Sequence, residues 1–140
     1  MVHCNPDPAD AETELLLRLR ATPEIFTMIS ECSAAELSSQ RKLRESFDQE
    51  LVRAALSLHE ARIKAMGSLP NAEQLWLTRV GLDQAPAWEV ARHKAHRFSA
   101  ANRVFDLCCG VGVDAGNIAA HTNVIAVDNA PSMCLRSTWK

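Results

Sequence analysis

Two carboxylates and two glycines lie close together in the segment RVFDLCCGVGVDAGNIAAHTNVIAVDNAP, which begins at residue 103. Asp106 ends one apolar run, Gly110 and Gly112 follow it, and Asp128 ends a second apolar run. Because glycine has no Cβ, the backbone there can turn sharply and approach a ligand closely. A carboxylate such as Asp128 is placed to accept hydrogen bonds from both hydroxyls of a ribose. These residue types, in this order, indicate a site for an adenosine-containing ligand.

The residues around these groups predict a β–α–β unit. We expect strands at residues 104–107 and 123–128, a turn at 108–112 and a helix at 113–121. The apolar run in the second strand is typical of a parallel sheet that is covered on both faces. Such a unit spans about 30 residues, and its ligand crevice lies at the carboxyl ends of the strands.

Two classes of ligand fit this pattern. Gly110, Gly112 and Ala115 match the G-x-G-x-x-G/A pattern of nicotinamide cofactor sites, and Asp128 follows Gly110 by 18 residues. Asp106 argues for the other class, because an acid at the end of the first strand would repel a pyrophosphate. It suits a ligand with a nearby cationic group, such as the amino acid end of S-adenosylmethionine, which it would meet directly or through water.

The series Asp106-x-Cys108-x-Gly110-x-Gly112 resembles motif I of class I S-adenosylmethionine-dependent methyltransferases, which is written D/E-x-G-x-G-x-G. Residues 124–128, VIAVD, resemble the acidic strand that follows that motif. The form D-L-C-C-G-V-G-x-D is similar to the subgroup of RNA cap guanine-N2 methyltransferases and bacterial relatives with a THUMP-like domain. Upstream, the residues from 78 to 95 are similar to the lead-in helix of that bacterial group.

The resemblance implies a site, a reaction and a substrate class. Methyl transfer from S-adenosylmethionine would be the reaction, and RNA would be the methyl acceptor. No catalytic residue is assigned, because the substrate motif of this subgroup lies beyond the fourth strand of the complete sheet. The resemblance assigns the cofactor pocket to Asp106, Cys108, Gly110 and Gly112, the ribose to Asp128, and a place near the pocket to Gln84.

The same resemblance implies a sheet of seven strands, of which this sequence supplies the first two. We therefore expect an N-terminal fragment of a methyltransferase, which is inactive as an isolated chain or is completed by a partner chain. Two alternatives stay open: a non-catalytic helical interaction protein with a Rossmann remnant, and a fragment of an NAD-dependent oxidoreductase.

The expected fold class is α/β, with a helical N-terminal region at residues 1–70 and the start of an incomplete Rossmann-like domain at residues 71–140. Helices are predicted at 9–20, at 23–29 with Thr22 as the cap and Pro23 at the first helical position, and from a capping box at Ser33–Glu36 to about residue 66. Residues 75–82 fit either a strand or a helix.

A further helix is predicted from Pro86, and one side of it carries a basic cluster: Arg92, His93, Lys94, His96 and Arg97. This cluster is either a solvated helix face or a surface beside an anionic substrate such as RNA.

Composition indicates the cellular compartment of the protein and which kinds of segment and site are not expected. The net charge is −2, and the sequence has no long apolar run and no basic N-terminal leader, so neither a membrane span nor a secretory signal is expected. The five cysteines form no CxxC pair and no cluster with metal-ligand spacing, so no metal site is expected. Free thiols are typical of a cytoplasmic protein.

Overall fold

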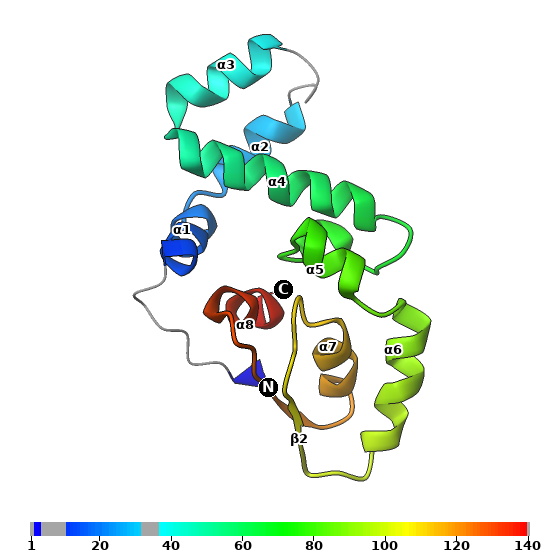
Figure 1. The fold of residues 1–140 in the computed structure, drawn as a ribbon. Coiled ribbons are helices and arrows are strands. Elements are labelled where there is room, and N and C mark those ends of the chain that lie inside the picture. Colours follow the sequence, from blue (N-terminus) through cyan, green and yellow to red (C-terminus); the bar gives the residue numbers. More distant parts are fainter. Residues whose placement is uncertain (1, 4–10, 32–36, 140) are drawn as a thin grey trace.

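The computed structural model describes residues 2–3, 11–31 and 37–139. Eight helices and three strands are defined in this part of the chain, and Figure 1 shows their arrangement. The helices are α1 (Ala11–Arg20), α2 (Glu24–Glu31), α3 (Leu37–Ser46), α4 (Gln49–Ala65), α5 (Arg79–Gln84), α6 (Trp88–Ala95), α7 (Val113–Ala119) and α8 (Pro131–Thr138). The strands are β1 (Val2–His3), β2 (Arg103–Asp106) and β3 (Asn123–Ala126), and short 3₁₀ helices lie at Ala72–Gln74 and His96–Phe98. The mixed α/β class is therefore confirmed.

The described strands form one small parallel sheet. The two predicted strands, β2 and β3, pair in parallel with Asp106 opposite Ala126, and α7 connects them. On its other side β3 pairs with β1, with Val2 opposite Val124, so the strand order is β1-β3-β2. Strand β1 was not predicted, because a strand of two residues has no periodicity to recognise.

The expectation that the sheet is covered on both faces was wrong for the described part of the chain. Val124 is fully buried on the face that packs against α7. Phe105 is 58% exposed and Leu107 is 67% exposed, and Val127 after the neighbouring strand is also exposed. The apolar runs of the two predicted strands therefore do not indicate burial on both faces of this sheet.

The N-terminal half is helical, and α1 and α2 confirm two of the predicted helices. The single long helix to residue 66 was wrong, because α3 and α4 are separate. Asp48 has an extended backbone between them, and its Oδ1 accepts a hydrogen bond of 3.0 Å from the backbone N–H of Leu51. This N-cap starts a new helix where the apolar pattern suggested continuity. The predicted capping box at 33–36 lies outside the described residues.

The segment that fitted either a strand or a helix contains no strand. Thr78 has an extended backbone, and its hydroxyl accepts a hydrogen bond of 2.9 Å from the N–H of Gly81, which starts α5. The predicted helix after Pro86 is confirmed as α6, which lies beside α7 (Figure 1).

One hydrophobic cluster joins the N-terminal helices to the end of the chain. It extends from Leu16 and Ile25 through Leu58 to Trp76 and Trp139. The rings of Trp76 and Trp139 meet edge to face, with centroids 4.8 Å apart. The packing of α1 against α8 extends this connection. A smaller cluster, which includes Val124, Ile118 and Cys134, lies around the sheet.

Candidate functional site

The turn after β2 brings the predicted site residues to the carboxyl end of the sheet. The N–H of Val127 donates to the carbonyl of Asp106, and the N–H of Cys109 donates to the carbonyl of Val127. These bonds, of 2.8 and 3.0 Å, continue the contact between β2 and β3 beyond the strand ends. Gly110 then has φ 52°, a conformation that a side chain makes unfavourable. A Cβ on Gly110 would have no neighbour within 4 Å, so there is open space in front of this turn.

Asp128 links the turn to the segment after β3. Its Oδ2 accepts a hydrogen bond of 2.9 Å from the N–H of Gly110, and its Oδ1 accepts one of 3.0 Å from the N–H of Ala130. Each carboxylate oxygen has two lone pairs, so both oxygens can still accept from a ligand hydroxyl. Asp128 thus holds the glycine turn in place, and its oxygens can still accept the hydrogen bonds predicted from a ribose.

Asp106, Gly110 and Asp128 line a cleft at this end of the sheet, and one carboxylate oxygen of Asp106 is unsatisfied. Its Oδ2 is buried and has no hydrogen-bond partner. Burial raises the pKa of this carboxyl, the N–H of Cys108 opposes the rise, and the nearby charges of Asp114 and Asp128 add to it. A buried acceptor without a partner costs about 1–3 kcal/mol, so a ligand that donates a hydrogen bond or brings a positive charge here would recover that loss.

The cleft is rich in carboxylates. It has a volume of about 270 Å³, and its lining includes Asp106, Asp114 and Asp128. Asp114 forms an ion pair of 2.6 Å with Lys94 through Oδ2, while its Oδ1 is buried without a partner. Three carboxylates in one cleft favour a ligand with a cationic group and disfavour a pyrophosphate. The volume is just below the range of about 300–1,000 Å³ typical of ligand pockets, so a nucleoside ligand would extend out of the cleft.

The two adjacent cysteines have different environments. Cys108 is exposed and lines the cleft, whereas Cys109 is buried. Burial raises the pKa of the Cys109 thiol to about 12, so this thiol stays protonated at neutral pH and is a poor nucleophile. Neither residue forms a disulfide.

Gly112, the second glycine of the motif, has a structural reason to be glycine. Its φ is 83°, and a Cβ there would approach the Cβ of Ser137 on α8 to 2.7 Å. Gly112 lines a neighbouring cavity beside Leu69 and Trp88 instead of the carboxylate cleft. The close approach of the turn to α8 therefore depends on this glycine.

The structure brings together most of the residues predicted for the cofactor site. Asp106, Cys108, Gly110 and Asp128 all line the cleft, as does Gln84 at the end of α5. Sequence reasoning missed the place of Asp114 in the cleft. It also missed Gly81, where a Cβ would lie 2.4 Å from Cγ1 of Val111 and prevent α5 from packing on the turn.

The basic cluster on α6 and on the 3₁₀ helix that follows it lies beside this site. Lys94 is engaged by Asp114, while Arg92, His93, His96 and Arg97 are exposed. The ring of His96 lies 4.8 Å, between centroids, from that of His121 after α7. In the part of the chain that the structure describes, no three His, Cys, Asp or Glu side chains gather closely enough to bind a metal ion. Within the same residues, no helix has both the length and the apolar character needed to cross a membrane.

Comparisons with models of known protein families, with curated proteins and with solved structures found no match to this chain.

Proposed function

We propose that this chain is the S-adenosylmethionine-binding part of a class I methyltransferase, in which β2, α7 and β3 begin a Rossmann-like sheet. The observation that carries the proposal is the unpaired, buried Oδ2 of Asp106 in a cleft with Asp114 and Asp128. The resemblance of the residues from Asp106 to Gly112 to motif I points to the same cofactor.

The residues present fit this cofactor. Asp106 has a free acceptor for the ammonium of the amino acid end, and Asp128 has lone pairs for the ribose hydroxyls. The open space at Gly110 allows a ligand to approach the backbone. When bound, S-adenosylmethionine supplies the activated methyl group and its own leaving group. The part of this chain is to bind and orient that molecule.

A titration calorimetry experiment tests the proposal. S-Adenosylhomocysteine, which has the same amino acid end and ribose, is added to the wild type, to Asp106→Asn and to Asp83→Asn. Asp83 is an aspartate of α5 that forms an ion pair with Lys64 outside the cleft, so it is the matched control. We expect Asp106→Asn to weaken binding by roughly 10- to 100-fold, because hydrogen bonds to charged groups contribute about 1.5–3 kcal/mol. The control should bind like the wild type.

The same titration separates the alternative functions. Binding of NAD in place of S-adenosylhomocysteine would contradict the proposal and favour an oxidoreductase. If the folded chain binds neither, the helical interaction protein becomes the better account.

RNA as the substrate class stays a prediction, which the exposed basic residues of α6 support. RNA binding through these residues should weaken as salt rises, because phosphate contacts release counterions. Fluorescence anisotropy with single-stranded RNA should detect weaker binding by Arg92→Glu and unchanged binding by Arg44→Glu, a matched change on α3. Equal binding by the two variants would count against RNA contact at α6.

A partner chain that completes the sheet also stays a prediction. Phe105, Leu107 and Val127 provide an exposed apolar surface that such a chain could cover.

A further inference from the structure

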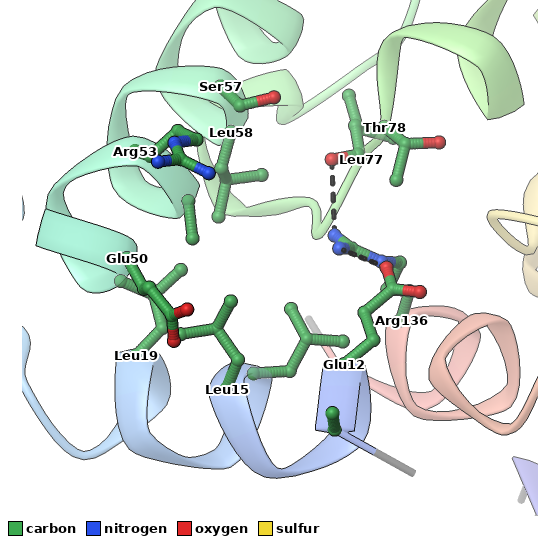
Figure 2. Close-up of a pocket in the computed structure, with 13 residues that line it drawn as sticks. Glu12, Leu15, Leu19, Glu50, Arg53, Ser57, Leu58, Leu77, Thr78 and Arg136 are labelled. Atoms are coloured by element: carbon green, nitrogen blue, oxygen red, sulfur yellow. Dashed lines mark hydrogen bonds and ion pairs between the residues drawn. The ribbon is translucent and has the colours of Figure 1, made fainter.

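A second cavity lies away from the carboxylate cleft, between α1, α4 and α8. Its volume is about 460 Å³, within the range of about 300–1,000 Å³ typical of pockets for small molecules. Figure 2 shows the residues around it. Leu15, Leu16 and Leu19 of α1 form one wall, and Leu58 of α4 and Leu77 lie on other sides. The cavity is thus apolar over much of its surface.

Arg136 brings a buried positive charge to this cavity. The residue is only 9% exposed. Its Nη1 donates to the carbonyl of Leu77 and its Nη2 donates to Oε1 of Glu12, each at 3.2 Å, as the dashed lines in Figure 2 mark. Guanidinium has five N–H donors, so these two bonds leave three unused. One of the unused donors, Nε, is buried without a partner.

Glu12 does not satisfy Arg136 fully. Its carboxylate is half exposed, and Oε2 accepts a hydrogen bond of 3.0 Å from the hydroxyl of Ser132. Burial lowers the pKa of Arg136, and the interaction with Glu12 only opposes that change. The guanidinium therefore retains the capacity to bind a second acceptor.

Arg53 supplies a second positive charge from the opposite wall. It lies on α4, and in Figure 2 its side chain extends toward the same space as Arg136. Among the described residues it forms no hydrogen bond and no ion pair. Glu50 and Arg53 are both exposed, so solvent and salt weaken the repulsion of an incoming anion by Glu50 and its attraction by Arg53 alike, and the buried Arg136 is the less screened charge. The positive charge of the arginines and the apolar lining of the cavity together match a molecule with an apolar body and an anionic end.

We propose that the cavity between α1, α4 and α8 binds a small apolar carboxylate, with its carboxylate between Arg53 and Arg136 and its apolar body against the leucines of α1. Bonds from guanidinium to carboxylate are charge-assisted and are about twice as strong as neutral ones. Burial of the apolar body adds the hydrophobic contribution. This proposal does not depend on the function proposed for the carboxylate cleft.

Sodium octanoate is a suitable probe, and 1-octanol is its neutral counterpart. We expect amide NMR shifts at residues of α1, α4 and α8 on addition of octanoate to the ¹⁵N-labelled protein. Arg53→Gln should weaken octanoate binding by roughly two- to fivefold, because Arg53 is exposed and solvent screens its charge. This variant removes no observed contact, so it should fold normally, and Arg44→Gln on α3 is the matched control, with unchanged affinity.

A second variant tests the location of the site. Ala54 lines the cavity from α4, and Ala54→Leu would fill part of it without placing a poor helix former in α4. Octanoate binding should be lost in this variant while the fold remains. Any of three results would overturn the proposal: equal octanoate affinity in Arg53→Gln and wild type, equal binding of 1-octanol and octanoate, or unchanged octanoate binding in Ala54→Leu.

Discussion

The two strand-end aspartates of the cleft share a residue type and differ in what surrounds them. Both oxygens of Asp128 accept hydrogen bonds from backbone N–H groups, so this side chain stabilises the turn that it faces. Asp106 keeps one buried oxygen without a partner, although Asp114 is close enough to raise its pKa. Buried polar groups are nearly always paired in folded proteins. Asp106 and Asp114 are both exceptions, but Asp114 already forms an ion pair with Lys94, so Asp106 is the residue of the cleft better prepared for a ligand.

Asp106→Asn should stabilise the protein at neutral pH. The pKa of Asp106 is raised in the folded state above its ordinary value of 3.8. As the pH rises, the carboxyl of Asp106 therefore loses its proton first in the unfolded chain. The folded state loses stability as the pH rises from about 3.8 through the raised pKa. Asp106→Asn lacks this loss, so we expect it to be more stable than the wild type at pH 7, by no more than about 1 kcal/mol because the carboxyl is partly exposed.

Urea unfolding at two pH values measures this effect. The advantage of Asp106→Asn should be present at about pH 7 and should nearly vanish at about pH 3, where the carboxyl is protonated in both states. A variant less stable than the wild type at neutral pH would show that Asp106 supports the fold instead of a ligand.

At the scale of elements, the two glycines of the turn should respond differently to a methyl group. Gly112→Ala should cost about 2–4 kcal/mol, because a positive φ and overpacking against Ser137 both oppose it. Gly110→Ala has the positive φ but no neighbour within 4 Å, so it should cost about 1–2 kcal/mol. Thermal unfolding of the two variants gives the comparison. Equal losses would mean that α8 does not pack on Gly112 as described.

The junction of α3 and α4 depends on the cap at Asp48. Asp48→Ala removes the acceptor for the N–H of Leu51, whereas Asp48→Asn keeps an oxygen in that place. The alanine variant should lose stability, measured as a lower melting temperature, and the asparagine variant should lose less. The hydrogen bond from Leu51 lowers the pKa of Asp48, so the advantage of the wild type over Asp48→Asn should fade as the pH falls through that lowered pKa. No difference between the two variants would contradict the cap.

The local sequence pattern predicted a helix or strand well where residues close in the sequence determine it. Strands β2 and β3, the turn between them and the start of α6 follow from apolar runs, glycine and proline. The pattern failed at Asp48, because an aspartate in a polar stretch fits a helix surface as well as an N-cap. It also failed for Asp114 and Gly81, whose places in the cleft depend on how α6 and α5 pack on the turn. Contacts between distant elements carry no local signal.

At the scale of the whole molecule, one core connects the helical N-terminal region to α8. Arg136 donates to the carbonyl of Leu77 and to Glu12 of α1, and Trp139 packs on Trp76. The bond from Arg136 to Glu12 and the packing of α1 against α8 cross the boundary predicted near residue 70. We therefore expect a single cooperative unfolding transition, in which tryptophan fluorescence and far-ultraviolet circular dichroism coincide. Two separated transitions would indicate that the halves unfold independently.

The measurement that tests the central claim most directly compares S-adenosylhomocysteine with 5′-methylthioadenosine, which lacks the amino acid end. Affinities of both for the wild type and for Asp106→Asn form a cycle that isolates the contact between Asp106 and the amino acid end. Our account predicts that the wild type prefers S-adenosylhomocysteine and that Asp106→Asn loses most of this preference. An equal preference in both proteins, or no binding of either compound by the folded wild type, would contradict it.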